Sequence, residues 1–217
     1  MDGIKDDSLE GILINDFDDL FNQLDPLQQK HSRRVAFCSQ IIAGEAQRVI
    51  SPVDVKKQCS PEIMYLSGMC HDLGKILLPQ NAVEEKCKQH PVLGVRLLEK
   101  FWAEIFGDFD DGVKKQTVIE AVRCHHEQPD GKGFPAGVCG KDIPFHAGIL
   151  SVANKLDGFF IKAKVLNKTK TDEILKYIES KSWTMFFDSI VFILGAAWND
   201  IIDFYIAEHK NCKGEEQ

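Results

Sequence analysis

The sequence predicts an all-α fold, and two observations carry that prediction. Apolar residues recur at three- and four-residue steps along most of the 217 residues, a spacing that places them on one face of a helix. The alternation of apolar and polar residues that is typical of a half-buried strand is not found. Residues 128–144 are rich in Gly and Pro and predict a loop between helices. We therefore expect a helical bundle with a Gly/Pro-rich loop and extra C-terminal helices.

Local signals place the expected helices in order along the chain. The spacing of apolar residues between positions 13 and 24 predicts a short first helix. Asp25-Pro26, Ser60-Pro61 and His90-Pro91 each open a further helix, because proline suits the first helical turn. The helices after the first are expected over residues 26–50, 61–74, 91–101, 113–125, 145–160, 171–182 and 185–208.

Composition and charge exclude several classes of protein. A hydrophobic fraction of 44% argues against disorder, and a net charge of -7 disfavours a nucleic-acid polymer as partner. The longest apolar run covers only residues 190–198, whereas a membrane span needs roughly 20 residues. The N-terminus is acidic where a signal peptide would be basic. We expect a soluble, cytoplasmic protein that does not bind membranes.

The seven cysteines are scattered, and no two of them are spaced as CxxC. This distribution argues against a zinc ribbon and against a disulfide framework. Cys70 and Cys124 directly precede candidate metal ligands, but packed core thiols are the favoured interpretation for both. We expect reduced, mostly buried thiols.

Histidines and one aspartate stand at the ends of predicted helices. His71-Asp72 closes one helix, His90 opens the next, and His125-His126 closes another before the Gly-rich loop. Imidazole nitrogens and carboxylate oxygens are ligands of divalent ions, and a carboxylate can bridge two ions. Lys75 follows Asp72 by one turn, where it is placed to neutralise a phosphate. This combination favours a metal site, because seven randomly placed histidines would seldom produce it.

Other polar residues near this pattern receive plainer interpretations. His146 and His209 are expected to be core or surface histidines without a catalytic role. Gly131 and Gly133 fit either a tight turn at the mouth of a substrate site or an ordinary surface turn. We expect Glu127 or Asp130 to fix the tautomers of the histidines.

The ordered motifs of the chain resemble those of HD-GYP domains. They are HSRRVA from His31, HDLGK from His71, HPVLGVRLL from His90 and HHEQPDGKGFP from His125. The last motif is the most specific, since the family shows HHE, two residues and then DGxGYP. The resemblance covers about residues 26–165. The HD pair alone would indicate only the wider HD superfamily of phosphohydrolases.

The resemblance implies an HD-domain-type helical bundle and a metal-dependent phosphodiesterase. Residues 25–165 would be the catalytic core, between an acidic N-terminal helix (1–24) and C-terminal helices (166–217) packed on the same domain. The implied substrate is cyclic di-GMP or a related cyclic dinucleotide, and the implied cofactor is a binuclear centre of iron or manganese. A GGDEF-type or other signalling protein and a second copy of the chain are the expected protein partners.

The family pattern also assigns roles residue by residue. Asp72 would bridge the two ions, and Lys75 would contact the substrate phosphate. The implied metal ligands are His31, His71, Asp72, His90, His125, His126 and Asn154, and the implied substrate-binding residues are Lys75, Asp130, Gly131, Gly133 and Lys162.

Four departures from the family pattern matter. Asn154 stands where the family has an aspartate, so one negative charge is missing from the expected site. Leu27 stands where some members have a glutamate that helps to hold a third ion, so we expect at most two ions. Phe134 replaces the signature tyrosine and lacks its hydroxyl. The Arg-containing phosphate-binding stretch is not reproduced, and Lys162 and Lys164 are the nearby basic residues.

A two-metal site would activate a water molecule for in-line attack on phosphorus, while Lys75 balances the charge that develops. Two other functions stay open at this point. A degenerate HD-GYP domain would bind nucleotide or a partner protein without turnover, and Asn154 favours that hypothesis. An HD phosphohydrolase acting on mononucleotides or alarmones would keep the metal, but the DGKGFP loop argues against it.

Overall fold

The structure is a computed structural model that describes residues 9, 14–50, 53–79, 81–107, 112–163 and 167–214. Secondary structure in these ranges is helical apart from one isolated bridge between Ser182 and Phe186, so the predicted all-α fold is confirmed. The elements are α1 (Phe17–Phe21), α2 (Pro26–Val49), α3 (Val53–Gln58), α4 (Pro61–Cys70), the 3-10 turn η2 (Leu73–Leu77), α5 (Glu84–Cys87), α6 (His90–Phe106), α7 (Val113–Cys124), the 3-10 turn η3 (Gly140–Asp142), α8 (Phe145–Lys162), α9 (Lys168–Glu179) and α10 (Asp188–Gly214).

The long helix α2 packs closely on α4. It begins as the sequence predicts, because the Asp25 carboxylate accepts a hydrogen bond from the Leu27 N–H at 2.8 Å and Pro26 takes the first position. A Cβ at Gly68 of α4 would overlap the backbone of Ala36 in α2. Only glycine therefore permits this approach of the two helices, which brings the site residues of α2 beside the end of α4.

Two hydrophobic clusters fill the interior. One lies among α1, α4, α6 and α7 and includes Leu20, Phe21 and Leu97. The other lies among α2, α8, α9 and α10 and includes Ile42, Leu150 and Tyr205. Because α2, α4 and α7 contribute to both clusters, these helices hold the two halves of the molecule together.

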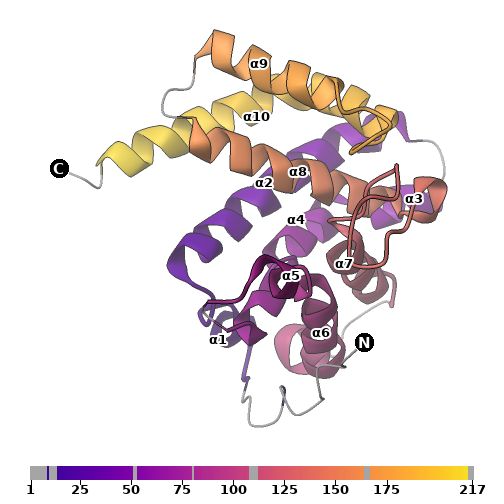
Figure 1. The fold of residues 1–217 in the computed structure, drawn as a ribbon, viewed down its shortest axis with the longest axis vertical. Coiled ribbons are helices and arrows are strands. Elements are labelled where there is room, and N and C mark those ends of the chain that lie inside the picture. Colours follow the sequence, from indigo (N-terminus) through magenta and orange to yellow (C-terminus); the bar gives the residue numbers. More distant parts are fainter. Residues whose placement is uncertain are drawn as a thin grey trace.

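The C-terminal helices α9 and α10 lie side by side over α8 and α2 (Figure 1). Within the described part of the chain, residues 188–210 of α10 form the one segment long and apolar enough to span a membrane by length and composition. Ile190, Leu194 and Ile201 on this segment are fully buried in the second cluster. One face of α10 is thus packed into this cluster, while Phe192 on the same helix is 74% exposed.

Several boundaries differ from those expected. The helix predicted over 171–182 is α9, which starts at Lys168 because the Asn167 side chain accepts a hydrogen bond from the Lys170 N–H at 2.9 Å. The helix predicted from 185 starts at Asp188, after a turn in which Trp183 has a φ of 60°.

Near the N-terminus and the candidate site, the differences are larger. The first helix covers only Phe17–Phe21, and Leu13 lies outside the described residues. The helix expected to end near Gly74 ends at Cys70, followed by the 3-10 turn η2. Two short helices, α3 and α5, were not predicted, because each is too short to show a helical period.

Candidate metal centre

Six of the predicted ligands meet in two adjacent groups. One comprises His31 of α2 with His71 and Asp72 after α4, and the other comprises His90, His125 and His126. Within each group, the potential ligand atoms all lie within 4.8 Å of one another.

Asp72 belongs to the first group and also contacts the second. Its Oδ2 is 3.1 Å from His71 Nε2 and its Oδ1 is 3.2 Å from His90 Nε2. The structure therefore brings together the residues that the sequence placed at helix ends, with the carboxylate in contact with both groups.

The local backbone explains this convergence. His71 is the C-cap of α4 and His125 is the C-cap of α7, so both side chains leave their helices where the backbone turns. A Cβ at Gly74 would overlap the carbonyl oxygen of His90. Glycine at position 74 thus lets η2 pack against the start of α6, which places Asp72 beside His90.

Backbone carbonyls fix the tautomers of three histidines. In each case Nδ1 lies 2.7 Å from the carbonyl oxygen of the residue three positions earlier, and because a carbonyl can only accept, Nδ1 must carry the proton. The pairs are His71 with Gly68, His90 with Cys87, and His125 with Val122. Each Nε2 is consequently left with a free lone pair.

These lone pairs face one another. His90 Nε2 is 3.2 Å from His125 Nε2, and His71 Nε2 is 3.3 Å from His31 Nε2. The buried Oδ1 of Asp72 has no hydrogen-bond donor. Converging acceptors without donors are unfavourable unless a cation lies among them, so the donor set fits divalent metal ions.

The expected tautomer-fixing role of Glu127 and Asp130 is wrong. Glu127 Oε1 accepts a hydrogen bond from the Ala136 N–H at 2.7 Å, and Asp130 Oδ1 accepts one from the Lys132 N–H at 3.1 Å. Both carboxylates therefore hold the Gly-rich loop in shape, and backbone carbonyls fix His71, His90 and His125 in their place.

His31 is oriented by a buried carboxylate that sequence reasoning missed. Asp157 of α8 lies 2.7 Å from His31 Nδ1 and accepts hydrogen bonds from Arg34 Nε at 2.7 Å and from the Tyr205 hydroxyl at 2.9 Å. Burial opposes ionisation of Asp157, but His31 and Arg34 outweigh it and hold its pKa below the usual value. The sequence carried a signal, because His31 opens a family motif and Asp157 lies inside the region of resemblance, but it did not pair them.

The charge states suit metal binding at neutral pH. Burial, with a further contribution from the neighbouring histidines, lowers the pKa of His90 to about 4 and that of His126 to about 3. The pKa of His125 is also held well below its usual value, chiefly by burial and then by His126. Burial opposes ionisation of Asp72, yet His71 and Lys75 together hold its pKa well below the ordinary range. Neutral imidazoles around an ionised carboxylate are the forms that ligate metal.

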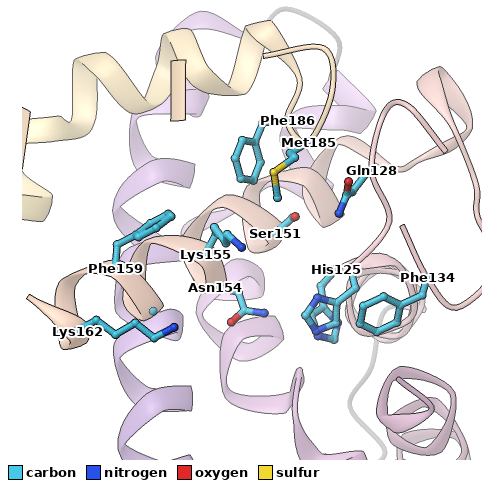
Figure 2. A pocket seen from close by; sticks show the side chains of 12 residues that line it. His125, Gln128, Phe134, Ser151, Asn154, Lys155, Phe159, Lys162, Met185 and Phe186 are labelled. Atoms are coloured by element: carbon cyan, nitrogen blue, oxygen red, sulfur yellow. The ribbon is translucent and has the colours of Figure 1, made fainter. Parts of the chain in front are cut away.

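Asn154 and Lys162 lie in the wall of a pocket of about 310 Å³ that reaches His125 and His126. Figure 2 shows Asn154 on one side of His125 and Phe134 on the other side. The Phe134 ring stacks on His126 with 4.4 Å between ring centroids, so the phenyl group still packs in the place of the signature tyrosine. Lys164 lies outside the described residues.

Lys75 borders a second pocket, of about 770 Å³. Its ammonium group lies 2.7 Å from Asp72 Oδ2 and 3.1 Å from Gln28 Oε1. Gln28, which sequence reasoning missed, also donates to Asp72 through its amide. Its neighbour Leu27 is 78% exposed. This is the position at which the HD-GYP resemblance leads one to look for a glutamate.

Asp130, Gly131 and Gly133 line neither of these two pockets. Gly131 has a φ of 75°, and a Cβ at Gly133 would lie 2.5 Å from the Cα of Glu127. The loop therefore folds back tightly on the segment that carries His125 and His126, as only glycine allows. In the structure, these three residues shape the loop.

The remaining histidines lie outside the two groups. His146 is buried, with Nε2 3.4 Å from Glu120 Oε2, and His209 lies within 3.3 Å of the backbone carbonyls of Tyr205 and Ala163. Of the cysteines, Cys70 is buried and Cys124 is half-buried.

The HD-domain sequence profile matches residues 29–158, which contain all of the candidate ligands. The chain belongs to the HD-domain family. This HD domain is 26% identical over 189 residues to a cyclic di-GMP phosphodiesterase of Thermotoga maritima, covering 82% of the chain and 47% of the relative. It is 24% identical over 182 residues to the 3'3'-cGAMP-specific phosphodiesterase 2 of Vibrio cholerae, covering 79% of the chain and 32% of the relative.

The chain spans less than half the length of these curated relatives. Among solved structures, the HD domain of the Listeria monocytogenes phosphodiesterase PgpH is similar, with a TM-score of 0.50 and 15% identity, over 89% of this chain and 98% of that one. At this identity the likeness shows the fold alone, and it agrees with the helical architecture described above.

Proposed function

We propose that this HD domain is a metal-dependent phosphodiesterase that hydrolyses a cyclic dinucleotide such as cyclic di-GMP. The observation that carries the proposal is the contact of Asp72 with two histidine groups whose lone pairs converge without a donor. The substrate class is supported by relatives that are named cyclic di-GMP and 3'3'-cGAMP phosphodiesterases.

The proposed centre is binuclear, with iron or manganese as the metal. His31 and His71 would hold one ion, His90, His125 and His126 the other, and Asp72 would bridge them, while Asn154 offers a neutral carbonyl oxygen from the pocket wall. When bound, divalent ions lower the pKa of a water molecule toward neutrality and neutralise charge on a phosphoryl group.

Lys75 is the proposed contact for the scissile phosphate. Its ammonium group lies at the border between Asp72 and the larger pocket, so a phosphate entering that pocket would meet a cation already positioned by Gln28. Positive charge at this point stabilises the additional negative charge of the transition state. Lys162 is the proposed phosphate contact in the smaller pocket. Asp130, Gly131 and Gly133 stay proposed substrate-binding residues of the Gly-rich loop.

The test combines metal analysis with a substrate panel. The protein is purified with added manganese or ferrous iron, its metal content is measured, and hydrolysis of cyclic di-GMP and 3'3'-cGAMP is followed by chromatography of the products. We expect bound metal and turnover, both lost in His125→Ala and both retained in the control His209→Ala, which alters a histidine outside the two groups. A protein that binds no metal under either condition would overturn the proposal.

Asn154 favours one alternative, a domain that binds a nucleotide without turnover, because it lacks the charge of an aspartate. Bound metal and measurable nucleotide affinity with no product from any substrate would support that alternative. Turnover of mononucleotides or alarmones instead of cyclic dinucleotides would identify a different HD phosphohydrolase. A cytoplasmic location, a signalling partner protein and a homodimer stay predictions from the sequence.

A further inference from the structure

We propose that the smaller pocket binds the half of the substrate that is not being cleaved, with Lys155 and Lys162 contacting its second phosphate. The inference rests on the proposed function and names the part of a two-phosphate substrate that this pocket recognises. Lys155 was not among the residues that the sequence motifs pointed to.

The two lysines share one face of α8. They are seven residues apart, which is close to two helical turns, and both line the pocket that reaches His125 and His126. Figure 2 shows their side chains projecting from the same helix as Asn154. Two cations are therefore displayed along a single wall that leads to the metal-binding histidines.

Neither ammonium group is paired with a described carboxylate, and the Lys155 ammonium group lies 5.8 Å from the centroid of the Phe159 ring. Among the residues that the structure describes, no carboxylate lies within 4 Å of Lys155 or Lys162, whereas Lys75, Lys132 and Lys170 each have one. The protein as a whole carries a net charge of -7, and these two lysines place positive charge at one pocket of it. They make this wall locally attractive to an anion.

Asn154 leaves this local positive charge uncancelled. It is the residue immediately before Lys155 and lines the same pocket. An aspartate at position 154 would place a negative charge beside Lys155, whereas the amide leaves the charge of the lysine uncancelled. Asparagine in place of aspartate at position 154 therefore removes a negative charge from the proposed metal centre and favours phosphate binding next to it.

Apolar side chains form much of the remaining wall of the pocket, beside Gln128 and Ser151. Phe159 extends from α8, while Met185 and Phe186 come from the turn between α9 and α10, which lies beyond the region matched by the HD-domain profile. In Figure 2 these side chains lie across the pocket from Phe134. Aromatic faces and a thioether are suitable surfaces for a nucleobase, so the pocket offers both a phosphate contact and a base contact.

The size of the pocket sets how much of the substrate it takes. About 310 Å³ is at the small end of ligand sites, and the larger pocket that Lys75 borders has about 770 Å³. A cyclic dinucleotide has two nucleotides joined through two phosphates. One phosphate at the Asp72 cluster leaves the other nucleotide to be bound nearby, and the smaller pocket contacts the cluster through His125 and His126.

The test compares a two-phosphate substrate with a one-phosphate substrate. The variants are Lys155→Gln, Lys162→Gln and the double variant, and the matched control is Lys176→Gln, an exposed lysine on α9 that lines neither pocket. The value of kcat/KM is measured for cyclic di-GMP and for bis(p-nitrophenyl) phosphate, with metal content determined for every protein. We expect the ratio of the two values to fall about tenfold for each pocket variant, the scale of one lost charge-assisted hydrogen bond. The control should keep the ratio of the wild type.

Three outcomes separate the two proposals. A selective loss on cyclic di-GMP supports the half-site. If the wild type hydrolyses cyclic di-GMP but the double variant keeps its ratio within twofold, or loses both activities equally, the half-site is wrong and the proposed function stands. If the wild type hydrolyses bis(p-nitrophenyl) phosphate and no cyclic dinucleotide, the proposed substrate is wrong and the half-site falls with it.

Discussion

Tyr205→Phe should lower the free energy of unfolding by about 2 kcal/mol, because it removes one hydrogen bond to a buried charge. The Tyr205 hydroxyl is fully buried and lies 2.9 Å from Asp157 Oδ1. Its ring stacks on Phe160 with 4.2 Å between ring centroids, a contact that phenylalanine keeps. A hydrogen bond to a charged group contributes about 1.5–3 kcal/mol, and the variant loses little else.

The assay is equilibrium unfolding in urea of the metal-free protein near pH 7. The urea concentration at the unfolding midpoint should fall, while the slope of the free energy of unfolding against urea concentration stays constant. Tm should drop by about 4–8 °C for a chain of this size. Tyr177→Phe is the control, because this half-exposed tyrosine makes ring contact with Phe159 and its hydroxyl donates to no residue that the structure describes. A loss below about 0.5 kcal/mol for Tyr205→Phe would refute the reasoning, since Arg34 and His31 alone would then satisfy the Asp157 carboxylate.

Four further predictions address the site and its supports. Lys75→Ala should keep metal content while kcat/KM falls by roughly 10²-fold, and loss of metal would instead make Lys75 a support of the ligand shell. Asn154→Asp should raise metal occupancy or turnover, and equal values in both proteins would show that Asn154 is not limiting. Burial lowers the pKa of His146 to about 4, so the unfolded chain takes up a proton first as pH falls below 6.5. Wild-type stability should therefore fall by about 2 kcal/mol more than that of His146→Gln between pH 7 and pH 5, measured by urea unfolding without metal, and equal losses would contradict the shift. Gly74→Ala should cost at least about 3 kcal/mol because its Cβ meets a carbonyl, whereas Gly44→Ala, with open space, should be neutral or stabilising by up to about 1 kcal/mol.

Much of the fold could be predicted because its signals are local. A proline at the first turn marks the starts of α2, α4 and α6, and each is followed by a helical apolar period. The start of α9 depends on the Asn167 side chain, a cap that lies outside the apolar period and was overlooked. The start of α10 depends on a turn with Trp183 at positive φ, which no rule for L-residues anticipates.

The candidate site divides in the same way. The histidines and Asp72 could be chosen from their motifs, and the structure brings them together. The residues that support them, Asp157 and Gln28, could not be chosen from the sequence. Asp157 contacts His31 and Gln28 contacts Asp72, and these pairs lie 126 and 44 positions apart in the chain. The pocket beside Asn154 depends on Met185, whose position is set by the packing of α10, so its apolar wall becomes visible only in three dimensions.

The carbonyl contacts of His71, His90 and His125 bear on how this protein can change over generations. The proton on each ring is positioned by the main chain three residues earlier, and every amino acid supplies that same carbonyl. Side-chain replacements at Cys87 or Val122 leave the acceptor in place as long as the backbone keeps its course, whereas Gly68 is held by its contact with Ala36. Residues in the walls of the smaller pocket, including the turn between α9 and α10, can therefore change while the histidine Nε2 atoms keep their orientation. In this architecture the walls of the pocket can change while the histidine cluster stays as it is.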